Sequence, residues 1–289
     1  MKHETEEKVQ ILEPKVIYED KDFLAVNKPS GMLVHGTWSV KHGTSDSKRG
    51  LKKESGDSRF TIQGLRERTL VDWVLERYPE IKGVGDPPSS RLGGTTDGQV
   101  TLERPGIVHR LDKDTSGVML VARNQEYFEY LKKLFQEHKI RKTYIALVYG
   151  IPKEKKGVID EPIALKPGTT KRSVFGGKME KEAVTEYEQV IGYRLKVLGG
   201  RKKKEELIDV SLLKVRPKTG RTHQIRVHLA SIGCPVLNDP IYASKKEKVG
   251  SGRLMLHALS LEFTSKEGKK IFIESEEPAE FKELSRHET

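Results

Sequence analysis

Residues 109–117 carry a dense set of reactive side chains in the stretch HRLDKDTSG, which stands directly before the apolar run VMLVA. Such a run is typical of a buried strand, and charged groups at its entrance need an explanation. In an extended chain, side chains alternate between two faces, so Arg110 and Asp112 would share one face. Two interpretations are open at this point: a structural ion pair, or a carboxylate held for catalysis. Asp114 is better explained as a turn residue.

A second polar cluster lies in the stretch TGRTHQIRVH, where Arg221 stands beside the start of a predicted helix and is followed by His223, Gln224, Arg226 and His228. This density of hydrogen-bond donors suits an anion or a polar base, and the alternative is a solvated helix face. Metal binding is disfavoured because the two histidines are five residues apart, whereas a spacing of four places two ligands on one helical face.

Other chemistries lack candidates in this sequence. Tyr144, in the stretch RKTYIAL, would by itself most often be a core aromatic with a satisfied hydroxyl. No glycine-rich dinucleotide pattern, phosphate loop or GxSxG motif occurs, which argues against a kinase, an ATPase, a dehydrogenase or a serine hydrolase. The single cysteine, Cys234, has no adjacent base and no second cysteine for a disulfide or a zinc cluster. The candidate chemistry that remains is that of a carboxylate close to arginines.

The composition points to a basic globular protein. The chain has 289 residues, of which 35% are hydrophobic, and a formal net charge of +11. Its length suits a substantial core, and its charge favours a polyanion as partner, with nucleic acid as the first expectation. The sequence shows neither a signal peptide nor an apolar stretch of about 20 residues, so we expect a cytoplasmic protein without a membrane partner.

The elements that must position these residues follow from hydrophobic periodicity. Thr69 and Asn124 are predicted to cap two helices, each with an apolar stripe, and Thr222 and Gly233 are predicted to begin and end a third. Hairpins are predicted at 15–29 and 254–275, strands at 118–122, 142–150, 183–191 and 208–215, and a short helix at 278–285. The many hairpins favour an α+β fold, with a mixed, mainly antiparallel central sheet flanked by helices.

Five stretches together resemble the signature regions of RNA pseudouridine synthases of the RluA type. They are YEDKDFLAVNKPSGMLVH, RPGIVHRLDKDTSGVMLVAR, KTYIALVYG, RPKTGRTHQIRVHLASIGCPVLNDPIY and LMLHALSLEF, in the family's order. The resemblance implies the pseudouridine synthase catalytic fold and the isomerisation of uridine to pseudouridine, with base flipping, in a structured ribosomal or transfer RNA. It implies no cofactor and no metal, and we expect a monomer.

The resemblance also assigns roles to five residues. Asp112 is similar to the family's essential aspartate, Tyr144 to its active-site tyrosine, and Arg221 to the arginine that pairs with the aspartate. Arg110 matches the residue that fills the vacancy left by a flipped uridine, and Leu256 matches an apolar residue under the base. The residue types fit these roles, because an ionised carboxylate can add to an electron-poor carbon while a close arginine favours the ionised form.

Two segments interrupt the family pattern. Irregular insertions rich in glycine and polar residues lie near 36–68 and 86–103, inside a catalytic domain expected over 15–289 behind an N-terminal tail at 1–14. That tail is too short for the S4-like domain that precedes many relatives. We expect the first insertion to be mobile in the free protein, at the rim of the RNA cleft, where it would help to grip the substrate. The alternative is a tolerated surface loop.

Two rival functions stand beside this expectation. One is a non-catalytic RNA-binding protein that keeps the fold, and the intact set of Asp112, Tyr144 and Arg221 argues against it. The other is a glycosidase, which would need two acids in acid and base roles, and the sequence shows no clear second acid.

Overall fold

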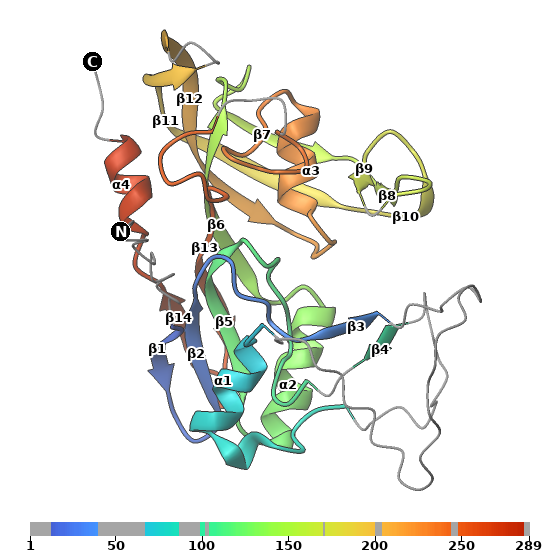
Figure 1. The fold of residues 1–289 in the computed structure, drawn as a ribbon. Coiled ribbons are helices and arrows are strands. Elements are labelled where there is room, and N and C mark those ends of the chain that lie inside the picture. The colour runs from blue at the N-terminus through green and yellow to red at the C-terminus, as the bar shows by residue number, and fades with distance from the viewer. Residues whose placement is uncertain are drawn as a thin grey trace, which may run out of the picture.

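The computed structural model describes residues 13–39, 67–86, 99–101, 104–169, 171–199, 204–243 and 248–285. A nine-stranded sheet runs through the molecule, in the order β1-β2-β5-β13-β6-β12-β11-β7, with β14 also paired to β13. Figure 1 shows α1 and α2 beside the first strands of this sheet and α3 beside β11 and β12. The β5–β13 pair is parallel and the other described ladders of this sheet are antiparallel, so the predicted mixed, mainly antiparallel α+β architecture is confirmed.

The sheet strands have the following bounds: β1 Lys15–Glu19, β2 Phe23–Lys28, β5 Ser116–Ala122, β6 Arg141–Tyr149, β7 Lys156–Asp160, β11 Val184–Gly199, β12 Lys204–Pro217, β13 Leu256–Thr264 and β14 Lys270–Glu274. The helices are α1 Leu70–Arg77, a 3₁₀ turn at Pro79–Ile81, α2 Gln125–Gln136, α3 Gln224–Ser231 and α4 Ala279–Ser285. The predicted hairpins and helices are therefore present. None of the described helices is long and apolar enough to cross a membrane.

Helix starts follow the predicted capping residues in two of three cases. Thr69 accepts a hydrogen bond from the backbone N–H of Asp72, whose carboxylate accepts from the Thr69 backbone in return, which completes a capping box for α1. Asn124 caps α2 by accepting from the Tyr127 backbone. Thr222 does not cap α3. The residue at that position is His223, in the left-handed conformation and without a capping bond.

Strand β5 explains the continuous apolar run after the charged stretch. All seven of its residues are buried, because α2 covers one face of the sheet and α1 covers the other. Val118 and Leu120 pack with α2 residues, whereas Met119 and Val121 pack with α1 residues. A strand covered on both sides has no polar face, so the usual alternation is lost.

Gly117 permits the single parallel contact of this sheet, at the start of β5. Its φ is +118°, a conformation that favours glycine, and an added Cβ would lie 2.1 Å from the carbonyl oxygen of Ala258 on β13. The TSG sequence that follows Asp112 therefore lets β5 and β13 approach closely beside the candidate catalytic loop.

Three short strands form a second sheet that the sequence did not predict. They are β8 Ile163–Leu165, β9 Arg172–Ser173 and β10 Lys178–Lys181, in the order β10-β8-β9. The first insertion was expected to be irregular, but β3 at Thr37–Ser39 pairs with β4 at Gln99–Thr101 and joins the ends of the two insertions. The rest of both insertions, and the expected mobility of the first, lie outside the described residues.

Candidate active site

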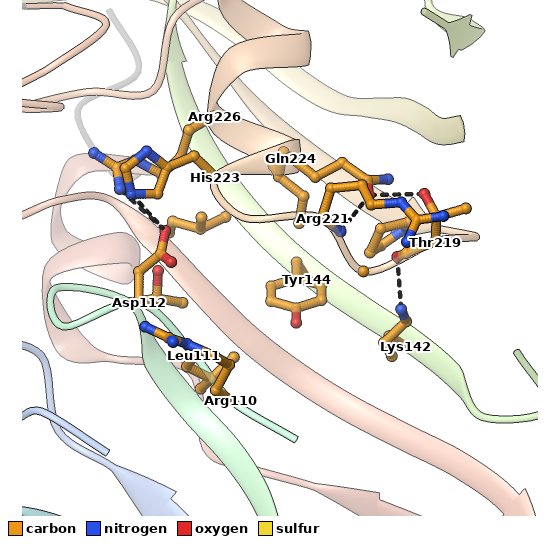
Figure 2. Close-up of a pocket in the computed structure, with 15 residues that line it drawn as sticks. Arg110, Leu111, Asp112, Lys142, Tyr144, Thr219, Arg221, His223, Gln224 and Arg226 are labelled. Atoms are coloured by element: carbon orange, nitrogen blue, oxygen red, sulfur yellow. Dashed lines mark hydrogen bonds and ion pairs between the residues drawn. The ribbon is translucent and has the colours of Figure 1, made fainter. Parts of the chain in front are cut away.

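One pocket collects the residues that the sequence singled out. It has a volume of about 100 Å³ and lies between the loop before β5, the start of β6 and the loop that leads into α3. Its lining includes all five residues expected to form the site: Arg110, Asp112, Tyr144, Arg221 and Leu256. Figure 2 shows Asp112 on one side of Tyr144 and Arg221 on the other.

Asp112 is held by an arginine that is itself fixed by a second carboxylate. Nη1 of Arg226 donates to Oδ2 of Asp112 at 3.0 Å, while Nε and Nη2 donate to the two carboxylate oxygens of Asp239 at 2.7 and 2.9 Å. Burial opposes the charge of Arg226, but Asp239 and Asp112 together raise its pKa. The bidentate bond therefore fixes the direction in which the remaining N–H points toward Asp112.

The expected pairing of Arg221 with Asp112 is wrong, because Arg226 occupies that place. Arg221 precedes the first turn of α3, and its Nε donates to the backbone carbonyl of Glu182 at 2.9 Å. Arg226 lies inside α3, only 3% exposed, where the helix turns its side chain toward both carboxylates. The two arginines are five residues apart, and the start of α3 decides which of them faces Asp112.

The two carboxylates differ in access. The Asp112 side chain is 21% exposed and lines the pocket, whereas the Asp239 side chain is fully buried and also accepts bonds from the backbone of Ile241 and Tyr242. Burial would raise the pKa of Asp239, but Arg226 and these backbone groups lower it. Asp112 can therefore meet a substrate, and Asp239 serves to orient Arg226.

The remaining polar residues of α3 are mostly internal, so a solvated helix face is wrong. Gln224 accepts from the Arg221 backbone and from Thr219, and its amide donates to β11. His228 bonds to Thr185 and to the Glu161 carbonyl. Such buried polar groups stabilise the loop that carries the pocket.

His223 stands next to the catalytic candidate as a neutral ring. Its Nδ1 lies 3.2 Å from the Tyr242 hydroxyl, and its Nε2 lies 3.8 Å from Oδ2 of Asp112. Burial lowers the pKa of His223, although Asp112 opposes that effect. His223 is therefore a polar wall of the pocket rather than a charged partner.

Tyr144 and Leu256 come from neighbouring antiparallel strands, β6 and β13. Burial raises the pKa of Tyr144, and the charge of Asp112 raises it further, so its hydroxyl stays protonated. Leu256 is 3% exposed and adds an apolar surface to the lining. A flat ring, a hydroxyl and an aliphatic side chain thus border the cavity next to the carboxylate.

The side chains of Arg110 and His109 point in different directions, as predicted for neighbouring residues of an extended chain. Arg110 is exposed, lines the pocket mouth and forms no ion pair with any described residue, so a structural Arg110–Asp112 ion pair is not found. His109 points away, stacks on Phe135 at 4.3 Å and accepts from the Leu120 backbone. Burial lowers the pKa of His109 to about 3.

A buried lysine supports the loop of Asp112 from below. Lys28, at the end of β2, is fully buried, and its Nζ donates to the carbonyls of Pro29, Met32 and Lys113 at 2.8 to 2.9 Å. Burial lowers its pKa to about 7, and Asp114 and Asp112 oppose that shift. Its bond to Lys113 fixes the backbone of the residue that follows Asp112.

Sequence reasoning missed Asp239, Lys28 and Lys142, all of which contact the site or its support. Lys142 lines the pocket two residues before Tyr144. Because side chains alternate along a strand, a lysine at that spacing faces the same way as the tyrosine, and this signal could have found it. Among the described residues, no group of three or more His, Cys, Asp or Glu side chains could hold a metal ion.

Comparisons with known proteins identify the family of this chain. Residues 92–231 match the family model of RNA pseudouridylate synthases. The chain is 36% identical over 277 residues to an uncharacterised RNA pseudouridine synthase of Aquifex aeolicus, covering 93% of this chain and 71% of the relative. It is 30% identical to ribosomal large subunit pseudouridine synthase D of Zymomonas mobilis, covering 93% and 71%, and 30% identical to tRNA pseudouridine synthase C of Haemophilus ducreyi, covering 88% and 86%.

A solved structure shows the same fold. The human RNA pseudouridylate synthase domain containing protein 1 superposes with a TM-score of 0.59 at 22% identity, covering 92% of this chain and 84% of the other. Fold, pocket and relatives define an RNA-modifying isomerase. The chain belongs to the RNA pseudouridine synthases of the RluA type, which isomerise uridine to pseudouridine.

Proposed function

We propose that this enzyme isomerises specific uridines of ribosomal or transfer RNA, with Asp112 as the essential carboxylate. The observation that carries the assignment is the difference between the two carboxylates on Arg226: Asp112 opens onto the pocket, and Asp239 is fully buried. The choice of RNA rests on two relatives, one named for the large ribosomal subunit and one for tRNA. We propose that the catalytic domain comprises 15–289 and that the enzyme works in the cytoplasm.

The reaction rearranges bonds without gain or loss of atoms. The carboxylate of Asp112 adds to an electron-poor carbon of the sugar or the base while the bond between the sugar and N1 breaks. The uracil then turns and its C5 bonds to the sugar, while the bond between the carboxylate and the carbon to which it had added breaks, so that Asp112 is regenerated. The proton on C5 is lost while N1 gains one. Nη1 of Arg226 donates to Oδ2 of Asp112 and so orients the carboxylate for this step.

The other pocket residues would hold a flipped base. Tyr144 offers a ring face for the uracil and a protonated hydroxyl near the site of proton transfer, and Leu256 adds an apolar contact. Arg110 lies at the pocket mouth without an ion pair to any residue that the structure describes, and its planar guanidinium can stack where the uridine has left the helix. Each group is placed by a different strand or loop around the same cavity.

The test is the release of tritium from RNA labelled at C5 of uridine. RNA from cells that lack this gene is incubated with the wild-type protein and with Asp112→Asn, and pseudouridines are then mapped. We expect release with the wild type and none with the variant, while RNA affinity is largely kept because phosphate contacts supply most of it. Wild-type turnover by Asp112→Asn would overturn the role of this residue, and absence of release by the wild type on both RNA classes would overturn the proposed substrates.

A further inference from the structure

Two cationic side chains, Lys142 and Arg221, lie on the side of the pocket opposite Asp112. Lys142 is on β6, and Arg221 is in the loop between β12 and α3. Figure 2 shows both beyond Tyr144, close to Thr219. Both line the same cavity. Burial lowers the pKa of Lys142, and the charge of Arg221 lowers it further. The two groups therefore repel each other at close range.

Backbone carbonyls hold these cations in place without neutralising them. Nζ of Lys142 donates to the Thr219 carbonyl at 2.7 Å, and Nε of Arg221 donates to the Glu182 carbonyl at 2.9 Å. Within the described part of the chain, neither side chain is in an ion pair. Arg226, on the other side of the pocket, contacts two carboxylates. The positive charge of the Lys142–Arg221 pair is thus left for a ligand.

The free donors match a phosphate group. A protonated lysine has three N–H groups, of which Lys142 uses one on Thr219, and Arg221 keeps its four terminal N–H groups free of the described residues. Guanidinium and ammonium groups both bind phosphate oxygens through charge-assisted hydrogen bonds. Two such groups on one wall can contact the non-bridging oxygens of a single phosphate.

We propose that Lys142 and Arg221 bind the backbone phosphate that links the target uridine to its neighbour in the RNA. This proposal rests on the proposed function, which places the uracil on Tyr144 and makes Asp112 the essential carboxylate. It replaces the expected role of Arg221, because Arg221 contributes to substrate binding and Arg226 contacts the carboxylate. The pair holds the flipped nucleotide by its backbone while the base enters the cavity.

The first experiment measures binding of a fluorescein-labelled RNA hairpin with a uridine-rich loop to the full chain. Lys142→Met and Arg221→Met should each weaken affinity by about tenfold, the effect of one charge-assisted contact. Each should also flatten the salt dependence of log affinity by about 0.7, the value for one single-strand phosphate contact. Lys142→Arg should keep both the affinity and the salt dependence of the wild type. The matched control is Lys282→Met on α4, which Figure 1 shows at the opposite edge of the molecule from β8–β10 and which should change neither quantity.

The second experiment neutralises the phosphates instead of the protein. Methylphosphonate linkages are placed one at a time along the hairpin loop. At one position, the methylphosphonate should weaken RNA binding by the wild type about as much as Lys142→Met weakens binding of unmodified RNA. In Lys142→Met, which has already lost this contact, the same linkage should weaken binding little further. This measurement decides the proposal on wild-type protein even if a variant fails to fold. A uniform response at all linkages would overturn it, as would an unchanged salt slope in both methionine variants.

Kinetics separate this proposal from the proposed function. With tritium release as the readout, both methionine variants should raise KM while kcat at saturating RNA changes little. A collapse of kcat with an unchanged salt slope would make Arg221 or Lys142 part of the chemical step and overturn the phosphate site. If the wild type released no tritium, the proposed function would fail, and the methylphosphonate measurement would still decide the binding site.

Discussion

Arg226 connects Asp112 to Asp239 through three donated hydrogen bonds, one to the exposed carboxylate and two to the buried one. The orientation of the candidate catalytic carboxylate therefore depends on Asp239, whose side chain is fully buried. Asp239 lies 13 positions after Arg226, in the loop that follows α3, and its backbone partners Ile241 and Tyr242 fix its orientation. The chain thus builds the Arg226–Asp239 pair from α3 and the loop after it, whereas Asp112 comes from the loop before β5.

Replacement of Asp239 should damage both stability and turnover. Asp239→Asn leaves the buried Arg226 guanidinium with one carboxylate instead of two, so we expect the free energy of unfolding to fall by about 3–5 kcal/mol. The control is Glu188→Gln, a half-exposed carboxylate on β11 that pairs with Lys156 and Arg216, and its replacement should cost about 1 kcal/mol or less. Denaturant titration checks both values. Equal effects of the two substitutions would show that the Arg226 network adds nothing to stability.

Turnover tests the positioning role of Asp239 separately. In the folded fraction of Asp239→Asn, kcat should fall while RNA affinity stays near that of the wild type, because Arg226 is no longer oriented toward Asp112. Arg226→Lys should give the same pattern, since a lysine cannot make the bidentate bond. A full kcat in folded Asp239→Asn would restrict the residue to a structural role.

RNA affinity should fall as the pH rises through about 8. Burial and the nearby Arg221 charge lower the pKa of Lys142 to about 8, so its phosphate contact is present below that pH and is lost above it. Two groups near Lys142 do not change charge in this range, because Tyr144 has a raised pKa and burial keeps His109 neutral. Lys28, which supports the Asp112 loop, has a pKa of about 7, so the comparison with Lys142→Arg isolates the contribution of Lys142. Hairpin binding measured from about pH 7 to about pH 9 checks this prediction. Lys142→Arg should remove the dependence, and its persistence in that variant would assign it to another group.

Gly117 should tolerate no side chain. A Cβ there would lie 2.1 Å from the Ala258 carbonyl oxygen, at a φ of +118°, so Gly117→Ala should lower the free energy of unfolding by more than about 3 kcal/mol. Gly168→Ala is the control, because its φ is also positive but nothing lies within 4 Å of the added Cβ. It should cost about 1–2 kcal/mol, from backbone strain alone. Similar losses for the two variants would mean that the β5–β13 contact can relax.

The sequence predicted most helices and strands, because these follow from local patterns, and the five candidate residues that it singled out line one pocket. Periodicity located β5 and α2, and caps at Thr69 and Asn124 fixed two helix starts. The sequence did not show that Arg226, rather than Arg221, contacts Asp112. That contact depends on where α3 starts, and α3 starts after His223, which takes a left-handed conformation. A non-glycine residue rarely adopts that conformation, and no pattern in the sequence signals it.

The β8–β10 sheet was missed for a related reason. Its strands are two to four residues long, too short to show a period of two, and mostly half-buried or exposed. Long-range pairing rather than local preference forms them. Lys28 was also missed, because a lysine buried against three carbonyls looks like any surface lysine in the sequence.

The last prediction concerns the first insertion, of which the structure describes β3 and the residues on either side of the gap at 40–66. Between residues 40 and 63, six basic residues outnumber three acidic ones: Lys41, Lys48, Arg49, Lys52, Lys53 and Arg59. We expect it to grip RNA beside the pocket. Replacement of residues 40–63 by a short Gly and Ser linker, which leaves β3 in place, should weaken RNA affinity. It should also flatten the salt dependence by about 0.7 for each lost single-strand phosphate contact.

A second variant separates charge from length, because long loops cost little closure entropy whatever their sequence. Substitution of the six basic residues by glutamine at full length should reproduce the loss of affinity and salt slope, while kcat at saturating RNA changes little in both variants. Hairpin binding across a salt series and tritium release are the measurements. Unchanged affinity in both variants would make the insertion a tolerated surface loop. A collapse of turnover with binding retained would instead place it in the active site.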